Sequence, residues 1–181
     1  MEKVKIKLDG GMMPRKGSSF AAAYDLYCPY DFKLHEGRQT VDLCFSLELP
    51  LYWKANIRPR SGFSSNGMEV MWKGFYSDGS EEEATVRLDA DVLLGLVDCD
   101  YRGHVGVTLY IRSLDCDVAW FKKDFKGEVY ALLREQSLFI PKGTRFAQME
   151  ICRGHETELV EVDELDMSND RGGGFGHSGT M

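Results

Sequence analysis

The stretch TVDLCFSLEL, residues Thr40–Leu49, decides the fold class of this 181-residue chain. Apolar side chains alternate along it with mostly polar neighbours, at Val41, Leu43, Phe45, Leu47 and Leu49. A period of two is typical of a strand that buries one of its faces. KVKIKL (residues 3–8), HVGVTLYI (residues 104–111) and TELVEVDEL (residues 157–165) continue the pattern. The sequence therefore predicts many half-buried strands.

Turn signals separate these runs, at Asp9-Gly10-Gly11, Glu36-Gly37, Asn66-Gly67, Asp78-Gly79 and Pro141-Lys142-Gly143. No segment keeps a helical apolar period for more than two turns. EVYALLREQ (residues 128–136) could form a short helix or equally a strand. The prediction is an all-β protein, a sandwich or barrel of short strands.

Composition limits the size and the partners of the protein. A chain of 181 residues with 43% apolar content suits one domain with a proper core. The formal net charge of −7 argues against nucleic acid or an anionic membrane as the main partner, but a small anion needs only a local arginine cluster. There is no apolar run of membrane-spanning length and no signal-peptide pattern. Five scattered cysteines without a C-x-x-C pair favour free thiols and a cytoplasmic location.

Two stretches look less like framework. Residues 71–91, MWKGFYSDGSEEEATVRLDAD, are predicted to form a β-hairpin with an acidic tip. Residues 114–135, LDCDVAWFKKDFKGEVYALLRE, are rich in aromatic residues and lysine. Both are interpreted as surface excursions.

Two stretches carry residues suited to phosphate. In IRPRSGFSS (residues 57–65), Pro59 fixes the backbone ahead of Arg60, Ser61 and Gly62, so a cation, a hydroxyl and backbone N–H groups converge. In IPKGTRFAQMEI (residues 140–151), Arg145 and Gln148 are the polar side chains of an otherwise apolar run. Arg145 suits a structural salt bridge as well as a ligand contact.

Two further stretches carry carboxylates. In GLVDCDYRGHVGV (residues 95–107), Asp98 and Asp100 would point the same way from an extended strand, which suits a general base beside the ring of Tyr101. An acidic hairpin turn is the alternative. In FAAAYDLYCPYDF (residues 20–32), Asp25 sits among apolar residues and needs partners if buried, and we expect backbone groups of a turn to supply them.

The C-terminal stretch NDRGGGFGHSGTM (residues 169–181) combines glycines with an arginine, a phenylalanine and a serine. A glycine-rich end is usually a spacer. A spacer has no use for Arg171 or an exposed Phe175, which suit a lid that closes over a ligand with both charge and a flat ring.

Taken in order, five stretches resemble the motifs of the trimeric dUTP diphosphatases (dUTPases): AAAYDLY, RPRSGFSS, GLVDCDYRG, KGTRFAQMEI and RGGGFGHSG. The resemblance spans the chain from about Lys3 onward, apart from the two excursions. It implies a jelly-roll β-barrel or sandwich that assembles as a homotrimer with active sites shared between subunits. Residues 1–168 would form the β domain, and residues 169–181 an arm that closes an active site.

The resemblance also implies the activity: hydrolysis of dUTP to dUMP and pyrophosphate, which limits uracil in DNA and supplies dUMP for thymidylate synthesis. Asp98 would activate the water that attacks the α-phosphate. Tyr101 would pack under the deoxyribose and exclude a 2′-hydroxyl. A hairpin around Gly95, Leu96, Val97 and Asp98 would read uracil and exclude thymine.

The remaining implied contacts hold the triphosphate. Arg60, Ser61, Gly62 and Gln148 would bind phosphates. Arg171 would pair with the terminal phosphates, Phe175 would stack on uracil, Gly176 would let the backbone wrap the substrate, and Ser178 would add a hydroxyl. Mg²⁺ is expected to be held through the substrate phosphates and not by a protein ligand cluster, with Asp25 a candidate neighbour of the ion.

The chain departs from the family pattern in its insertions and in having one residue fewer between Arg171 and Phe175. One alternative is the dCTP deaminase branch of the same fold, which requires a glutamate base where this chain has Asp98. The other is a dUTP-binding sensor whose insertions contact a protein partner. Because a pure sensor could lose Asp98, its presence favours the hydrolase.

Overall fold

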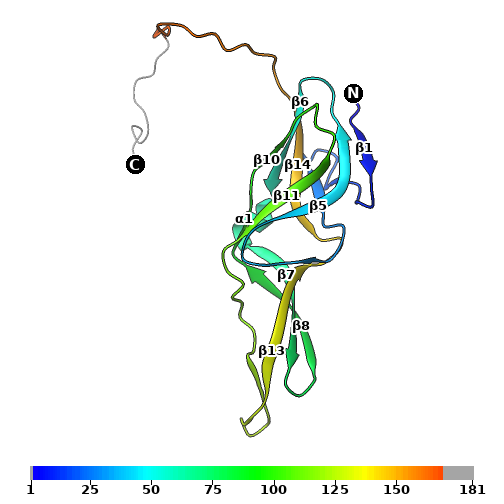
Figure 1. Ribbon diagram of the computed structural model, residues 1–181, viewed down its shortest axis with the longest axis vertical. Helices are drawn as coiled ribbons and strands as arrows, with labels where there is room; N and C mark the ends of the chain where they lie inside the picture. The colour runs from blue at the N-terminus through cyan, green and yellow to red at the C-terminus, as the bar shows by residue number, and fades with distance from the viewer. Residues whose placement is uncertain (1, 169–181) are drawn as a thin grey trace.

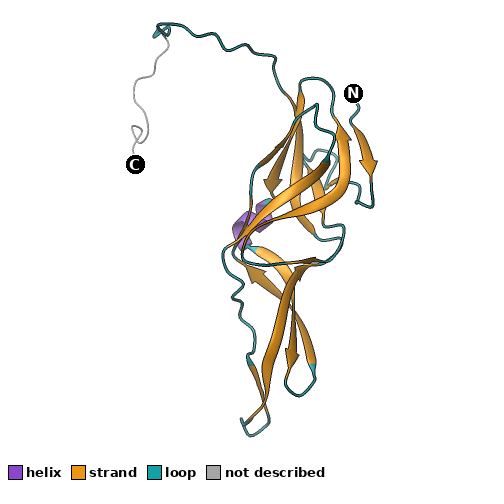
Figure 2. Ribbon diagram, in the orientation of Figure 1, coloured by secondary structure: helices purple, strands orange, loops and turns teal. Residues whose placement is uncertain are grey.

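The computed structural model describes residues 2–168 and is built almost entirely of strands (Figures 1 and 2). One short helix, α1 (Ser61–Asn66), interrupts them. The strands are β1 (Lys5–Leu8), β2 (Arg15–Lys16), β3 (Tyr24–Tyr27), β4 (Phe32–Lys33), β5 (Gly37–Glu48), β6 (Trp53–Pro59), β7 (Met68–Tyr76), β8 (Glu81–Leu88), β9 (Ala90–Val92), β10 (Gly95–Val97), β11 (His104–Ile111), β12 (Phe121–Lys123), β13 (Val129–Ile140) and β14 (Arg145–Arg153).

The described strands form three sheets. Two of them make the body, with strand orders β1-β5-β11-β9 and β10-β6-β14-β3-β2. The third, β12-β13-β7-β8, projects from one end of the body, and we call it the protruding sheet (Figure 1). β4 pairs with β13 where that strand joins the body. The all-β jelly-roll prediction is confirmed.

The period of two in TVDLCFSLEL builds the core of the body. Val41, Leu43, Phe45 and Leu47 on β5 are all buried, while most of their neighbours face outward. β11 pairs antiparallel with β5 and buries the matching alternate set from Val105 to Ile111. Burying a large apolar side chain contributes about 1.5–3 kcal/mol, so this alternation fixes both strands in register.

The first excursion is the hairpin that its sequence predicts. β7 and β8 pair from Met68↔Leu88 to Phe75↔Glu81, and Asp78-Gly79 turns the chain at the tip. The buried Trp72 donates from Nε1 to Gln136 Oε1 of β13 at 2.9 Å. The second excursion supplies β12 and half of β13, so EVYALLREQ is a strand. Four of its aromatic side chains are exposed: Trp120, Phe121, Phe125 and Tyr130.

The strand expected at TELVEVDEL is wrong, because the chain has no regular secondary structure from Gly154 to Val162 and only bends and a turn beyond. Its apolar side chains are exposed, including Leu159 at 99%. A strand needs a hydrogen-bonded neighbour, and the chain leaves the body after β14 without meeting one (Figure 1). Alternation of apolar and acidic residues is therefore not enough to predict a strand.

Smaller predictions agree with the structure. Glycines in all five predicted turns have positive φ, between 78° and 94°, at Gly10, Gly37, Gly67, Gly79 and Gly143. The five cysteines are free thiols. No helix within residues 2–168 has the length and apolar content needed to cross a membrane.

An ion cluster links the residue after β1 and the middle of β5 to the start of β11. His104 Nδ1 lies 3.0 Å from Asp42 Oδ2, and His104 Nε2 lies 3.3 Å from Asp9 Oδ2. The hydrogen bond with Asp42 raises the pKa of His104 above its ordinary value. The same bond lowers the pKa of Asp42. The pKa of Asp9 is lowered mainly by its hydrogen bond with Lys7, and to a smaller extent by its hydrogen bond with His104.

This cluster is predicted to make the protein less stable as the pH rises. Below about pH 6.5 the imidazole is charged in both folded and unfolded chains, so the stabilising pairing is fully present. As the pH rises through the raised pKa of folded His104, that contribution is lost. The slope of unfolding free energy against pH in this window should therefore shrink in His104→Gln, measured by urea denaturation at fixed protein concentration. His35→Gln, whose ring meets a backbone carbonyl, is the control, and an unchanged slope in His104→Gln would contradict the assignment.

Candidate active site

A cavity of about 690 Å³ gathers residues of the first, second and fourth sequence motifs. We call it the arginine groove, after Arg58, Arg60, Arg87 and Arg145 in its lining. Its other polar side chains include Asp25, Glu69, Glu150, Ser61 and Gln148. Four guanidinium groups face three carboxylates here, in a chain whose net charge is −7. The groove is thus a local site for an anion.

Asp25 organises this groove by pairing with two arginines at once. Its Oδ1 accepts from Arg60 Nε at 3.0 Å, and its Oδ2 accepts from Arg145 Nη1 at 3.3 Å. The Asp25 side chain is 13% exposed. The expectation that it serves the backbone of a turn is wrong: it lies in β3, and side chains are its partners. Burial of the carboxylate requires this pairing.

Sharing one carboxylate leaves the arginine pair with surplus positive charge. Arg60 also donates from Nη1 to the Arg145 carbonyl at 3.2 Å, which fixes its orientation. The side chains of Arg60 and Arg145 stay 32% and 51% exposed. Arg145 therefore makes the salt bridge that was one of its two predicted roles, while both guanidinium groups keep donors that can reach an oxyanion.

Ser61, Gly62 and Gln148 complete this side of the site. Ser61 and Gly62 are exposed at the start of α1, and a Cβ placed on Gly62 would meet nothing within 4 Å among the described residues. Gln148, on β14, donates from Nε2 to the Pro59 carbonyl at 2.9 Å. The structure thus brings the four predicted phosphate contacts, Arg60 included, into one groove.

A second cavity of about 190 Å³ gathers the third motif. We call it the tyrosine pocket, and its lining is Ile57, Gly95, Leu96, Val97, Asp98, Tyr101, His104, Val105 and Gly106. All five residues predicted from the third motif are therefore in one place. Among the described residues it shares no lining residue with the arginine groove.

The local geometry differs from the expected strand and hairpin. β10 ends at Val97, and the Tyr101 N–H donates to the Asp98 carbonyl at 3.2 Å, so Asp98 and Asp100 belong to a turn. β10 pairs with β6, and β11 pairs with β5 and β9, so the described strands form no ladder between β10 and β11. The turn connects the two body sheets. Asp98 is exposed beside the pocket.

Tyr101 is held by its own turn. Its hydroxyl donates to the His104 carbonyl at 3.1 Å, and Arg102 Nη1 donates to the Cys99 carbonyl at 2.7 Å. A Cβ on Gly103 would lie 2.4 Å from the Tyr101 hydroxyl. Glycine at this position therefore allows the ring to fold back onto the turn.

Sequence reasoning missed several groove residues. Glu69 and Arg87 come from the β7–β8 hairpin, and Arg58 and Glu150 form a pair at 3.1 Å across β6 and β14. Strand alternation predicts that such side chains face outward, but not which cavity they line. Arg171, Phe175, Gly176 and Ser178 lie outside the described residues.

Among residues 2–168, no group of three or more histidine, cysteine, aspartate or glutamate side chains is arranged to hold a metal ion. Both oxygens of Asp25 accept from arginine, so this carboxylate is engaged as a partner of guanidinium groups. The donor set of the groove is cationic and suits the phosphates of a metal–nucleotide complex rather than the metal itself.

Comparisons with solved structures give the fold independently. A variant of the Staphylococcus bacteriophage 80alpha dUTPase with dUpNHpp aligns with a TM-score of 0.71 at 22% identity, covering 99% of both chains. A dUTPase variant from phage phi11 of S. aureus, described with a structural Mg(II) ion, aligns with a TM-score of 0.65 at 18% identity over 91% of this chain and 99% of the other.

Comparisons of sequence identify the family. The dUTPase family model matches residues 9–76. The deoxyuridine 5′-triphosphate nucleotidohydrolase of rabbitpox virus is 32% identical over 92% of this chain and 84% of its own length. The tomato (Solanum lycopersicum) enzyme of the same name is 31% identical over 98% and 80%, and a mitochondrial one from Dictyostelium discoideum 32% over 98% and 76%. With the motif residues placed in these two cavities, the chain belongs to the dUTPase family.

Proposed function

We propose that this protein is a dUTP diphosphatase, which hydrolyses dUTP to dUMP and pyrophosphate and so limits uracil in DNA and supplies dUMP. The observation that carries the proposal is the distribution of the family motifs over two cavities. One cavity is a cationic groove fit for phosphates, and the other is a small pocket fit for a base and sugar. Named relatives of similar length support the same activity.

In the arginine groove, the protein binds and orients the triphosphate. Arg60 and Arg145 would each turn their free N–H groups to phosphate oxygens while Asp25 keeps them in place. Ser61, the Gly62 backbone and Gln148 add neutral donors. Phosphoryl transfer mainly requires positioning and stabilisation of negative charge, which a fixed arginine pair supplies.

In the tyrosine pocket, the protein selects the nucleoside and activates water. Uracil enters beside Gly95, Leu96 and Val97, and the Tyr101 ring packs against the deoxyribose. Asp98 takes a proton from the water as its oxygen attacks the α-phosphorus, and pyrophosphate leaves. One exposed carboxylate within reach of the water is sufficient for general-base catalysis.

The separation of the cavities supports a shared active site. Since the groove and the pocket of one chain have no lining residue in common within residues 2–168, Asp98 of one subunit would meet the arginine groove of another. A closed homotrimer would give three such sites. Residues 169–181, which follow the β domain of residues 1–168, would act as the arm. Arg171 and Ser178 would contact phosphates, and Phe175 would stack on the base. Gly176 would let the backbone wrap the substrate.

Mg²⁺ would reach the site bound to the triphosphate, whose phosphates Arg60, Arg145 and Gln148 hold. When bound, the ion would supply positive charge opposite the leaving pyrophosphate. Asp25 would support the binding of the ion indirectly, by keeping the two arginines in place.

A cytoplasmic location of the protein stays a prediction, since one relative is named mitochondrial.

A second role as a dUTP-responsive interaction protein is favoured by the protruding sheet. Four aromatic side chains are exposed just before β12, on β12, in the turn after it and on β13: Trp120, Phe121, Phe125 and Tyr130. Such a cluster is typical of a surface that contacts protein. The phage 80alpha dUTPase, which is similar to this chain in fold, controls transfer of virulence genes. For this chain the partner role is an addition to hydrolysis.

The first test is pyrophosphate release from dUTP with Mg²⁺. Asp98→Asn should lower kcat by about 10²–10⁴-fold, the size of a general-base contribution. Asp100→Asn removes the same charge two residues away, outside both cavities, and should stay within a few-fold of wild type. dTTP, dCTP and UTP serve as competitors. Binding of dUTP without cleavage by the wild type would instead indicate the sensor.

Mixing subunits tests whether sites are shared. Asp98→Asn and Arg60→Gln should each be nearly inactive alone. Mixed trimers refolded at equal amounts should regain about a quarter of wild-type activity, because each site then takes each residue independently from a random mixture. No recovery, with mixed trimers verified by mass, would mean that one chain supplies both residues.

Gly103→Ala tests the packing of Tyr101. The added methyl group should push the ring out of its turn, since the clash is with the far end of a side chain that can move. The variant should fold normally but discriminate against UTP roughly tenfold less well than wild type. The measurement is the ratio of kcat/KM for dUTP to that for UTP, and Asp100→Asn, in the same turn but outside the pocket lining, is the control. Unaltered discrimination would remove Tyr101 from sugar selection.

A further inference from the structure

The β7–β8 hairpin forms one wall of the arginine groove. Glu69 on β7 and Arg87 on β8 are direct cross-strand partners at the base of the hairpin, and both line the groove. Neither belongs to the five motifs, and the functional proposal above assigns neither a role. The insertion therefore places a cation on the phosphate side of the site.

Arg87 is held loosely. Its Nε and Nη2 both donate to the same oxygen of Glu69, Oε1, at 3.3 and 2.9 Å. Both side chains are 60% exposed. An ion pair of this exposure contributes little to stability, so a more strongly charged partner can replace the glutamate. Within residues 2–168 the Nη1 group of Arg87 has no hydrogen-bond partner, and the planar guanidinium suits two oxygens of one phosphate.

The other arginines of the groove differ in this respect. Arg60 and Arg145 are fixed by Asp25, which is mostly buried. Arg58 pairs with Glu150, which has a second nearby donor in Asn56 Nδ2, at 3.5 Å. Glu69 has Arg87 as its single partner among the described residues. Arg87 is thus the guanidinium of the groove that can change partner with least loss.

We propose that Arg87 binds the pyrophosphate end of the nucleotide and exchanges Glu69 for phosphate oxygens when the groove fills. The inference rests on the proposed function for the identity of the nucleotide. Arg87 is a binding residue, and Glu69 is its internal competitor, which returns to the arginine as pyrophosphate leaves. An element outside the family motifs then sets the affinity for the phosphate chain.

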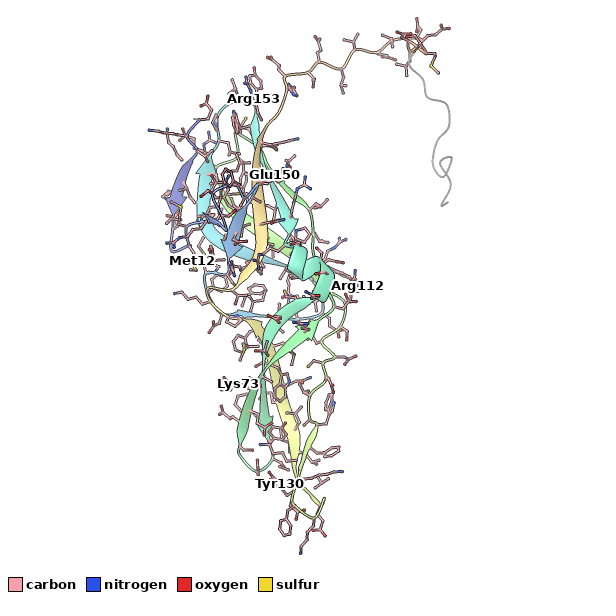
Figure 3. The ribbon with its side chains drawn as sticks, turned by 180° about the vertical axis from the view of Figure 1, so that it is seen from behind. Met12, Lys73, Arg112, Tyr130, Glu150 and Arg153 are labelled. Atoms are coloured by element: carbon pink, nitrogen blue, oxygen red, sulfur yellow. The ribbon has the colours of Figure 1, made fainter. Side chains whose placement is uncertain are left out.

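The test is calorimetric titration of the full-length protein with inorganic pyrophosphate, dUpNHpp and dUMP. Arg87→Gln should weaken pyrophosphate and dUpNHpp roughly tenfold, as for loss of one charge-assisted contact, and leave dUMP unchanged. Glu69→Gln should tighten the first two several-fold. Lys73→Gln is the matched control, because Lys73 shares the outer face of β7 with Glu69 but lies in the protruding sheet, outside the groove (Figure 3). The affinities of this variant should stay within twofold of those of the wild type.

Steady-state kinetics add a separate readout. Arg87→Gln should raise KM for dUTP roughly tenfold with little change in kcat, and should lower the salt dependence of kcat/KM. If Arg87→Gln and Lys73→Gln weakened pyrophosphate binding equally, the effect would be one of long-range charge, and the proposal would be overturned. So would unchanged pyrophosphate affinity in Arg87→Gln. A wild type that binds pyrophosphate through Arg87 but does not cleave dUTP would overturn the proposed function alone.

Discussion

The carboxylate of Asp25 is the constraint on which the site depends. It lies in β3, opposite Gln148 of β14, and it pairs with Arg60, the residue after β6, and with Arg145 at the start of β14. Three segments far apart in the sequence are thereby set against one another. A mostly buried carboxylate with two cations avoids the cost of an unpaired charge, and it leaves the cations unsaturated. The same contact thus stabilises the sheet and prepares the groove for phosphate.

A jelly roll explains why the groove and the pocket are apart. Asp98 follows β10 at one edge of its sheet, whereas Asp25 and Arg145 belong to β3 and β14 on the other side of β6. On β6 itself Ile57 lines the pocket and the next residue, Arg58, lines the groove, and consecutive side chains of a strand point to opposite faces. In the proposed homotrimer, a second copy of the chain would supply the missing half without changing either sheet. The positions of the motifs favour such a symmetric assembly.

The sequence predicts the body well because burial repeats every second residue. Val41 to Leu49 and Val105 to Ile111 need no knowledge of their partners to be assigned to strands. The failures are of another kind. TELVEVDEL has the alternation but no neighbouring strand, and the turn at Asp98 joins two sheets instead of one hairpin. Asp25 and Arg87 acquire their roles from residues 35 and 18 positions away, which local pattern does not encode.

In the role proposed for Arg87, the insertion acts on substrate at its base, and its tip remains free for other contacts. β7 begins directly after α1, and Met68 and Leu88 are buried, so the hairpin is anchored beside the groove. Nine residues of strand span about 30 Å, which places the tip well away from the phosphates. Lys122 stiffens the far part, with Nζ 2.7 Å from Glu82 Oε1 and 4.2 Å from the Tyr76 ring centre. A contact at the tip would therefore reach Arg87 only through this stiffened sheet. A shift of the hairpin base would first change the affinity of the arginine groove for phosphate.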